Sequence, residues 1–123
     1  MTTIWVGLAA AGAIGAPCRY LLDRFVSERV GGVFPWGTFV INLSGSLLLG
    51  VIAGASLYHA LPNTSKVILG TGFCGAYTTF STWTYETVRL LEDGDVLDAA
   101  RNAAASLILC GAAAGIGLAL AAL

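Results

Sequence analysis

The sequence predicts an all-α protein that crosses a membrane four times, with an interruption in the third membrane-spanning helix. Its 123 residues are 57% hydrophobic and only 11% charged, whereas a soluble domain carries about a quarter charged residues. Four apolar segments, at about 3–25, 36–59, 66–91 and 98–122, each reach the roughly 20 residues that a helix needs to cross a bilayer. Since no long polar segment remains, we expect residues 1–123 to form a single transmembrane domain.

The first segment is expected to be a span of the mature protein. Met1, Thr2 and Thr3 lack the basic start of a secretory signal, and no small-residue cleavage site follows. Small residues four apart, such as Ala11 and Gly15, allow another helix to approach closely. Arg19 either extends to the headgroup region, as a charge near the end of a span usually does, or is held by a neighbouring span.

The second segment carries polar residues at a helical spacing. Trp36 at its start suits the membrane interface. Thr38, Asn42 and Ser46 follow at intervals of four residues, which places them on one helical face. The Asn42 amide either links two helices, as amides within membranes often do, or lines a polar path.

The third segment predicts a broken helix. It places glycines and hydroxyl residues where a span should be most apolar: Gly70, Gly72, Gly75, Thr78, Thr79, Ser81, Thr82 and Thr84. Such backbone is stable at membrane depth only where protein or a hydrated path surrounds it. Because unwound carbonyls coordinate small cations, those around Gly75 and Thr78 are candidates to hold Na⁺ or a similar ion.

The fourth segment repeats the polar spacing of the second, with Asn102, Ser106 and Cys110. GxxxG pairs at 50–54 and 111–115 add surfaces for close helix packing. A chain of four helices has little interior in which to bury three polar segments, and polar surface exposed to lipid is costly. The sequence therefore favours a homo-oligomer in which a second copy supplies the missing walls.

A polar path without an embedded carboxylate suits an anion or a neutral solute better than a cation. The candidate donors are amides, hydroxyls and one guanidinium: Asn42, Asn102, Thr38, Ser106, Thr82 and Arg19. Phe80 and Trp83, three residues apart after the break, could add ring edges, where the aromatic quadrupole is positive. Packing is the alternative role for these two rings.

Other function classes find no support in the sequence. The single histidine, His59, falls in a connection, so no catalytic constellation can be built around it and we do not expect an enzyme. The three cysteines show no CxxC spacing and are expected to be buried free thiols. A net charge of −1 gives no indication of nucleic-acid binding.

Three ordered motifs resemble the Fluc/CrcB family of fluoride channels over essentially the whole chain. They are Gly15-Ala-x-x-Arg19-Tyr20; Pro35-Trp36-Gly37-Thr38 with Asn42-x-x-Gly45-Ser46; and Gly72-Phe-Cys-Gly75-x-x-Thr78-Thr79-Phe80-Ser81-Thr82. The resemblance implies an antiparallel, dual-topology homodimer in a bacterial-type cell (inner) membrane. It further implies two passive fluoride pores per dimer and a structural Na⁺ at the dimer centre.

The resemblance also implies roles for individual residues. Asn42 would donate to fluoride, Phe80 would be the first member of an aromatic box, and the Gly75 and Thr78 carbonyls would hold Na⁺. Arg19 would lie in a positive vestibule and Glu86 near a pore mouth, while Ser106 would fall on a polar track along the fourth span. The chain departs from the family pattern at Trp83, normally Phe and here with an added N–H donor, at Asn102, normally Tyr, and at Cys110, normally Ser.

Three alternatives stand beside the homodimeric channel. A four-span exporter of the small multidrug-resistance type needs a membrane-embedded acid, and the first span has only Asp23, at its very end. A structural subunit would use the polar stripes for packing alone. Arg24, Arg29 and Arg101 lie in or beside the first and third connections, on one side of the membrane, and only Lys66 falls on the other side. By the positive-inside rule, this imbalance is compatible with a subunit of fixed orientation that pairs with a differently encoded chain.

Overall fold

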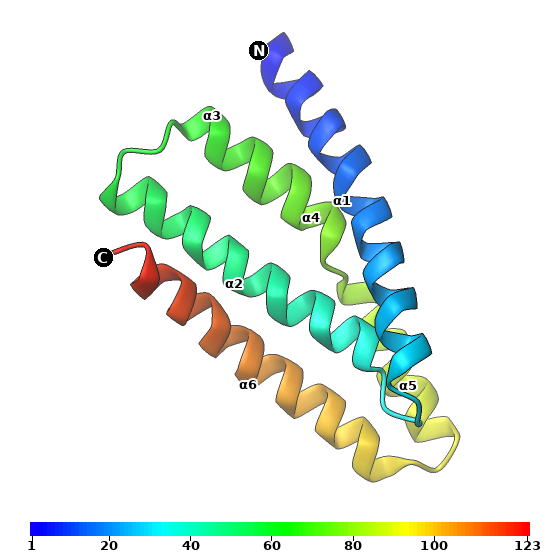
Figure 1. The fold of residues 1–123 in the computed structure, drawn as a ribbon. Coiled ribbons are helices and arrows are strands. Elements are labelled where there is room, and N and C mark those ends of the chain that lie inside the picture. Colours follow the sequence, from blue (N-terminus) through cyan, green and yellow to red (C-terminus); the bar gives the residue numbers. More distant parts are fainter.

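The computed structural model describes all 123 residues and contains helices but no strands (Figure 1). The elements are α1 (Thr2–Arg29), α2 (Trp36–Tyr58), α3 (Asn63–Lys66), the π-helix η1 (Val67–Cys74), α4 (Gly75–Tyr77), α5 (Phe80–Glu92) and α6 (Val96–Leu120). Three of them, α1, α2 and α6, are long and apolar enough to cross a membrane. The all-helical class is confirmed, and the third predicted span is divided into α3–η1–α4 and α5.

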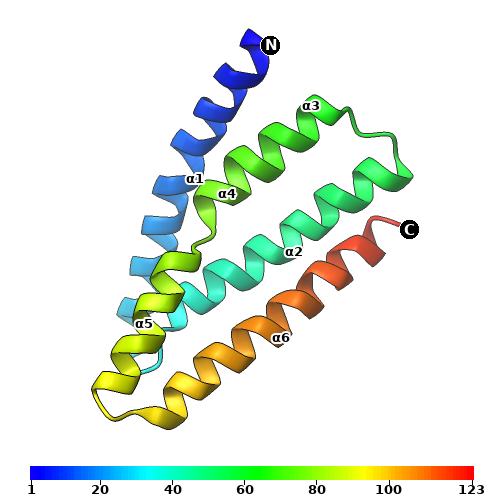
Figure 2. The ribbon, with the colours of Figure 1, turned by 180° about the vertical axis from the view of Figure 1, so that it is seen from behind.

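The helices form an open arrangement in which α2 is central. It packs along α6 on one side and against α1 and η1 on the other (Figures 1 and 2). Both chain termini lie toward the end of the molecule that carries the connection from α2 to α3, whereas α5 lies toward the opposite end, beside the start of α6. Only 19 of the 123 residues are buried. Most of the apolar surface is therefore left for lipid or for other chains.

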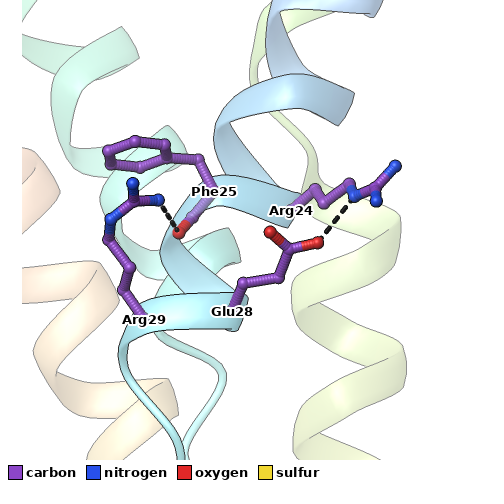
Figure 3. Close-up of polar contacts among 4 residues, drawn as sticks. All are labelled: Arg24, Phe25, Glu28 and Arg29. Carbon is purple, nitrogen blue, oxygen red and sulfur yellow. Dashed lines mark hydrogen bonds and ion pairs between the residues drawn. The ribbon is translucent and has the colours of Figure 1, made fainter.

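The first helix is longer than the sequence predicted. It continues through Pro17 and ends at Arg29 rather than near residue 25. Its last turns carry an ion pair between Arg24 Nε and Glu28 Oε1 at 2.7 Å, and the Arg29 guanidinium lies 3.6 Å from the centre of the Phe25 ring (Figure 3). Pairs at this spacing, together with a cation at the helix C-terminus, account for the added turn.

Small residues set the closest helix contacts. A Cβ on Gly15 would lie 2.6 Å from the Phe73 carbonyl oxygen, so α1 touches the backbone of η1 there. A Cβ on Gly54 would lie 2.9 Å from the Leu118 carbonyl oxygen of α6. In contrast, Gly111 and Gly115 have no atom of another residue within 4 Å of such a Cβ. The first GxxxG pair thus packs within the chain, and the second faces outward.

The break lies at two threonines and not at the preceding glycines. Gly75 is still helical, with φ −63° and ψ −36°, whereas Thr78 and Thr79 are extended, with ψ 163° and 120°. The Thr78 hydroxyl donates back to the Cys74 carbonyl at 2.8 Å. The Thr79 side chain accepts from the Thr82 N–H at 3.2 Å and so caps the start of α5. These hydroxyls end one helix and begin the next.

Candidate functional site

The main candidate site is an open cavity of about 540 Å³ between α2, the helix break, α5 and α6. No charged side chain lines it. Its polar and aromatic walls come from α2, from the stretch around the break and from α6: Asn42, Ser46, Cys74, Thr78, Thr79, Phe80, Trp83, Ser106 and Cys110. The break therefore opens onto an uncharged space whose surface is mostly apolar, with a few polar groups among the lining residues.

Asn42 is joined to the broken backbone by two hydrogen bonds. Its Nδ2 donates to the Thr79 carbonyl at 2.9 Å, and its Oδ1 accepts from the Thr79 N–H at 2.8 Å. In a continuous α-helix that N–H would donate to the Gly75 carbonyl. Asn42 therefore replaces the helical partner of Thr79, and one of its two N–H groups remains available in the cavity wall.

The two carbonyls expected to hold a cation differ in their surroundings. The Gly75 carbonyl accepts no backbone hydrogen bond, because the Thr79 N–H is taken by Asn42. The Thr78 carbonyl accepts from Arg19 Nη1 at 3.4 Å. Arg19 is thus half-buried and contacts the helix break. The Gly75 oxygen fits a cation ligand, whereas the Thr78 oxygen has a guanidinium beside it.

Phe80 and Trp83 lie together at the cavity edge. Their ring centres are 5.3 Å apart, with a tilt of 49° between the planes. Phe80 is 76% exposed, so packing within the chain does not account for its position. The Trp83 indole Nε1 donates to the Asn102 carbonyl at 3.1 Å. Its N–H is therefore committed to the protein and is not a free donor in the cavity.

On α6, the predicted polar stripe divides between the cavity and the protein interior. Ser106 and Cys110 line the cavity. The Ser106 hydroxyl is buried and has no hydrogen-bond partner in the chain, so its proton is available to a ligand. Asn102 is fully buried outside the cavity, where its Nδ2 donates to Thr87 Oγ1 at 2.9 Å.

Three other predicted residues lie outside the cavity lining. The Thr38 hydroxyl, 2% exposed, donates to Glu86 Oε1 at 3.0 Å. Glu86 lines a second cavity of about 390 Å³, near the connection between α1 and α2. Glu86 therefore lies outside the main cavity, and its Oε2 is buried without a hydrogen-bond partner. Thr82 is exposed and accepts from the Thr79 hydroxyl at 3.0 Å.

Two residues that organise the site were not singled out from the sequence. Thr79 supplies the backbone that Asn42 binds, and its position just before a new helix, as the N-cap, was the available signal. Thr87 follows Trp83 by four residues, and its hydroxyl donates to the Trp83 carbonyl at 2.8 Å. That spacing places both residues on one face of α5.

The fold and the cavity define a membrane protein with an uncharged site, mostly apolar with a few polar groups, at a broken helix. The family model described as "CrcB-like protein, Camphor Resistance (CrcB)" matches residues 6–118. A relative from Frankia casuarinae, named "Fluoride-specific ion channel FluC 1", is 50% identical over 122 residues, which cover 95% of both chains. The "Fluoride-specific ion channel FluC" of Geotalea daltonii is 46% identical over 110 residues, or 89% of this chain and 87% of that one.

The chain belongs to the CrcB-like family. The resemblance inferred from the three motifs is thereby confirmed. The relatives carry the name of an ion channel and not of an enzyme, in agreement with the lack of a catalytic constellation in the sequence.

Proposed function

We propose that the chain is the subunit of a passive, fluoride-selective channel that exports F⁻ from the cytoplasm. The observation that carries this proposal is the uncharged cavity, whose walls offer the Ser106 hydroxyl, the second N–H of Asn42 and the exposed Phe80 ring. Fluoride is small and strongly hydrated, so it needs donors that replace water. Amides, hydroxyls and ring edges provide them without fixing the ion by a full charge.

The cavity favours an anion path over a proton-coupled cation exporter. Such an exporter needs an acid that alternates between a proton and the substrate, and no carboxylate lines the cavity. A negative-inside potential drives an anion outward by about 2.3 kcal/mol per 100 mV. A passive pore is therefore sufficient for export.

A second copy of the chain is proposed to complete the path. Asn42, Thr78 and Ser106 line a cavity that is open on one side, and such groups are not stable against lipid. Phe80, Leu107 and the outward-facing Gly111 surround the same opening. We take the second copy to lie antiparallel, as the resemblance implies, which gives two pores per homodimer in a bacterial-type inner membrane.

A structural Na⁺ at the dimer centre is part of the proposal. The Gly75 carbonyls of both copies would hold it and would thereby bind the two broken helices together. The Thr78 carbonyls, which the resemblance also implies as ligands, would have to accept from Arg19 at the same time. The unpaired Gly75 carbonyl supports this assignment. Replacing sodium with N-methylglucamine during purification is expected to lower the thermal stability of the dimer, and equal stability in the two salts would contradict the site.

Ion efflux from liposomes tests the proposed function. Purified protein is reconstituted, and fluoride and chloride release are followed with ion-selective electrodes. The wild type is expected to release fluoride and retain chloride, whereas Phe80→Ile is expected to lose most fluoride efflux. Phe25→Ile is the matched control, because Phe25 is also exposed but lies on α1 beside Arg29. Equal release of both halides, or of neither, would refute the proposal.

A further inference from the structure

A closed circuit of three hydrogen bonds joins α5 to α6 beside the cavity. The Trp83 indole N–H donates to the Asn102 carbonyl at 3.1 Å. The Asn102 side-chain Nδ2 donates to Thr87 Oγ1 at 2.9 Å. The Thr87 hydroxyl in turn donates to the Trp83 carbonyl at 2.8 Å. Each of the three residues is therefore both donor and acceptor within the circuit.

The circuit fixes the orientation of the indole ring. An indole has a single donor and no acceptor, so its bond to Asn102 determines how the ring is turned about the end of its side chain. Asn102 is 0% exposed, and its amide is anchored to the same helix that carries Trp83. The anchored groups thus set the position of one cavity wall.

The Trp83 indole N–H donates to the main-chain carbonyl of Asn102, which any residue at that position would supply. Phenylalanine at position 83 would have no N–H to donate to the Asn102 carbonyl. The Asn102 side chain enters the circuit through its bond to Thr87, and the Thr87 hydroxyl joins that amide to the Trp83 carbonyl.

We propose that Asn102 and Thr87 are positioning residues that hold the Trp83 ring at the wall of the ion path, and not donors to the ion. This inference rests on the proposed channel function for its effect on flux. The predicted effect on the orientation of the indole ring rests on the hydrogen-bond geometry alone.

The first test is a double-mutant cycle on fluoride efflux. Thr87→Val removes the hydroxyl at nearly constant volume and is expected to slow efflux about fivefold, the factor that corresponds to the loss of roughly 1 kcal/mol. In a Trp83→Phe background the same change is expected to alter efflux less than about twofold, because the phenylalanine ring makes no hydrogen bond that the loss of the Thr87 hydroxyl could disturb. Thr87→Ser keeps the hydroxyl and is expected to restore the wild-type rate. Equal losses in both backgrounds would overturn the proposal.

The second test observes the indole directly and does not depend on transport. The protein has three tryptophans, so Trp83→Phe identifies the Trp83 indole N–H signal in ¹⁵N–¹H NMR spectra. That proton is expected to exchange with deuterium more slowly than those of Trp5 and Trp36, and at least about fivefold faster after Thr87→Val.

Thr84→Val is the matched control, because the Thr84 hydroxyl donates to the Phe80 carbonyl on the exposed side of α5, outside the circuit. It is expected to leave exchange at Trp83 unchanged. Unchanged exchange in Thr87→Val would contradict the circuit even if fluoride flux is normal. A wild type that carries no fluoride but shows the expected exchange would refute the channel function and the role in flux while leaving the circuit intact.

Discussion

Asn42 has a structural role that its place in a polar stripe does not reveal. Both ends of its amide bind the Thr79 backbone, so this one side chain stabilises the helix break while contributing an N–H to the cavity. From the sequence, Asn42 is a polar residue at membrane depth that either links two helices or lines a polar path. The structure assigns the first, and the second remains a prediction.

Asn42→Ala is expected to destabilise the protein as well as to slow fluoride efflux. It leaves the N–H and carbonyl of Thr79 without partners, and Thr79 is only 8% exposed. An unsatisfied buried group costs about 1–3 kcal/mol, so thermal unfolding in detergent should shift to lower temperature. Thr84→Val is the control, because its hydroxyl is exposed. An unchanged unfolding temperature for Asn42→Ala would show that the two bonds do not stabilise the break.

At the scale of the helices, the sequence predicted the all-helical class and the interruption of the third span, but not the residues at which the break and the end of α1 lie. The glycines suggested where the third helix weakens, yet Gly75 stays helical and the chain opens at Thr78 and Thr79. The position depends on Asn42, 37 residues earlier in the chain. A pattern found within one segment cannot contain that long-range contact. The extension of α1 to Arg29 is accompanied by one ion pair and one cation–π contact, which a hydropathy pattern does not register.

The close packing of α1 against the broken helix gives a prediction from two glycines one turn apart. A Cβ at Gly15 would lie 2.6 Å from the Phe73 carbonyl oxygen, whereas one at Gly12 would lie 3.8 Å from its nearest neighbour. Gly15→Ala is expected to lower stability by about 1–3 kcal/mol through overpacking. Gly12→Ala should be neutral or slightly stabilising, because alanine favours helix. Thermal unfolding of both variants checks this, and equal effects would contradict the predicted contact.

For the whole molecule, the main cavity is open and few residues are buried within the single chain. The homo-oligomer expected from three polar segments in a small chain agrees with this shape. Its antiparallel arrangement comes from the resemblance alone. The uneven distribution of arginines between the two sides keeps the paired heterodimer as the competing assembly.

Subunit counting separates these assemblies. The chain expressed alone, labelled at one terminus with a fluorophore and reconstituted at low density, is expected to bleach in two steps, with the terminus accessible on both sides of the membrane. One-step bleaching would contradict a homodimer. Two steps with the label on one side only would contradict dual topology.

The reversal potential of the current through planar bilayers tests passive fluoride conduction most directly. With a tenfold fluoride gradient and equal proton concentrations, a passive fluoride-selective pore is expected to give a reversal potential of about 59 mV. That value should not change when a chloride or proton gradient is added. A reversal potential that follows protons or chloride, or the lack of any fluoride current, would contradict a selective passive pore.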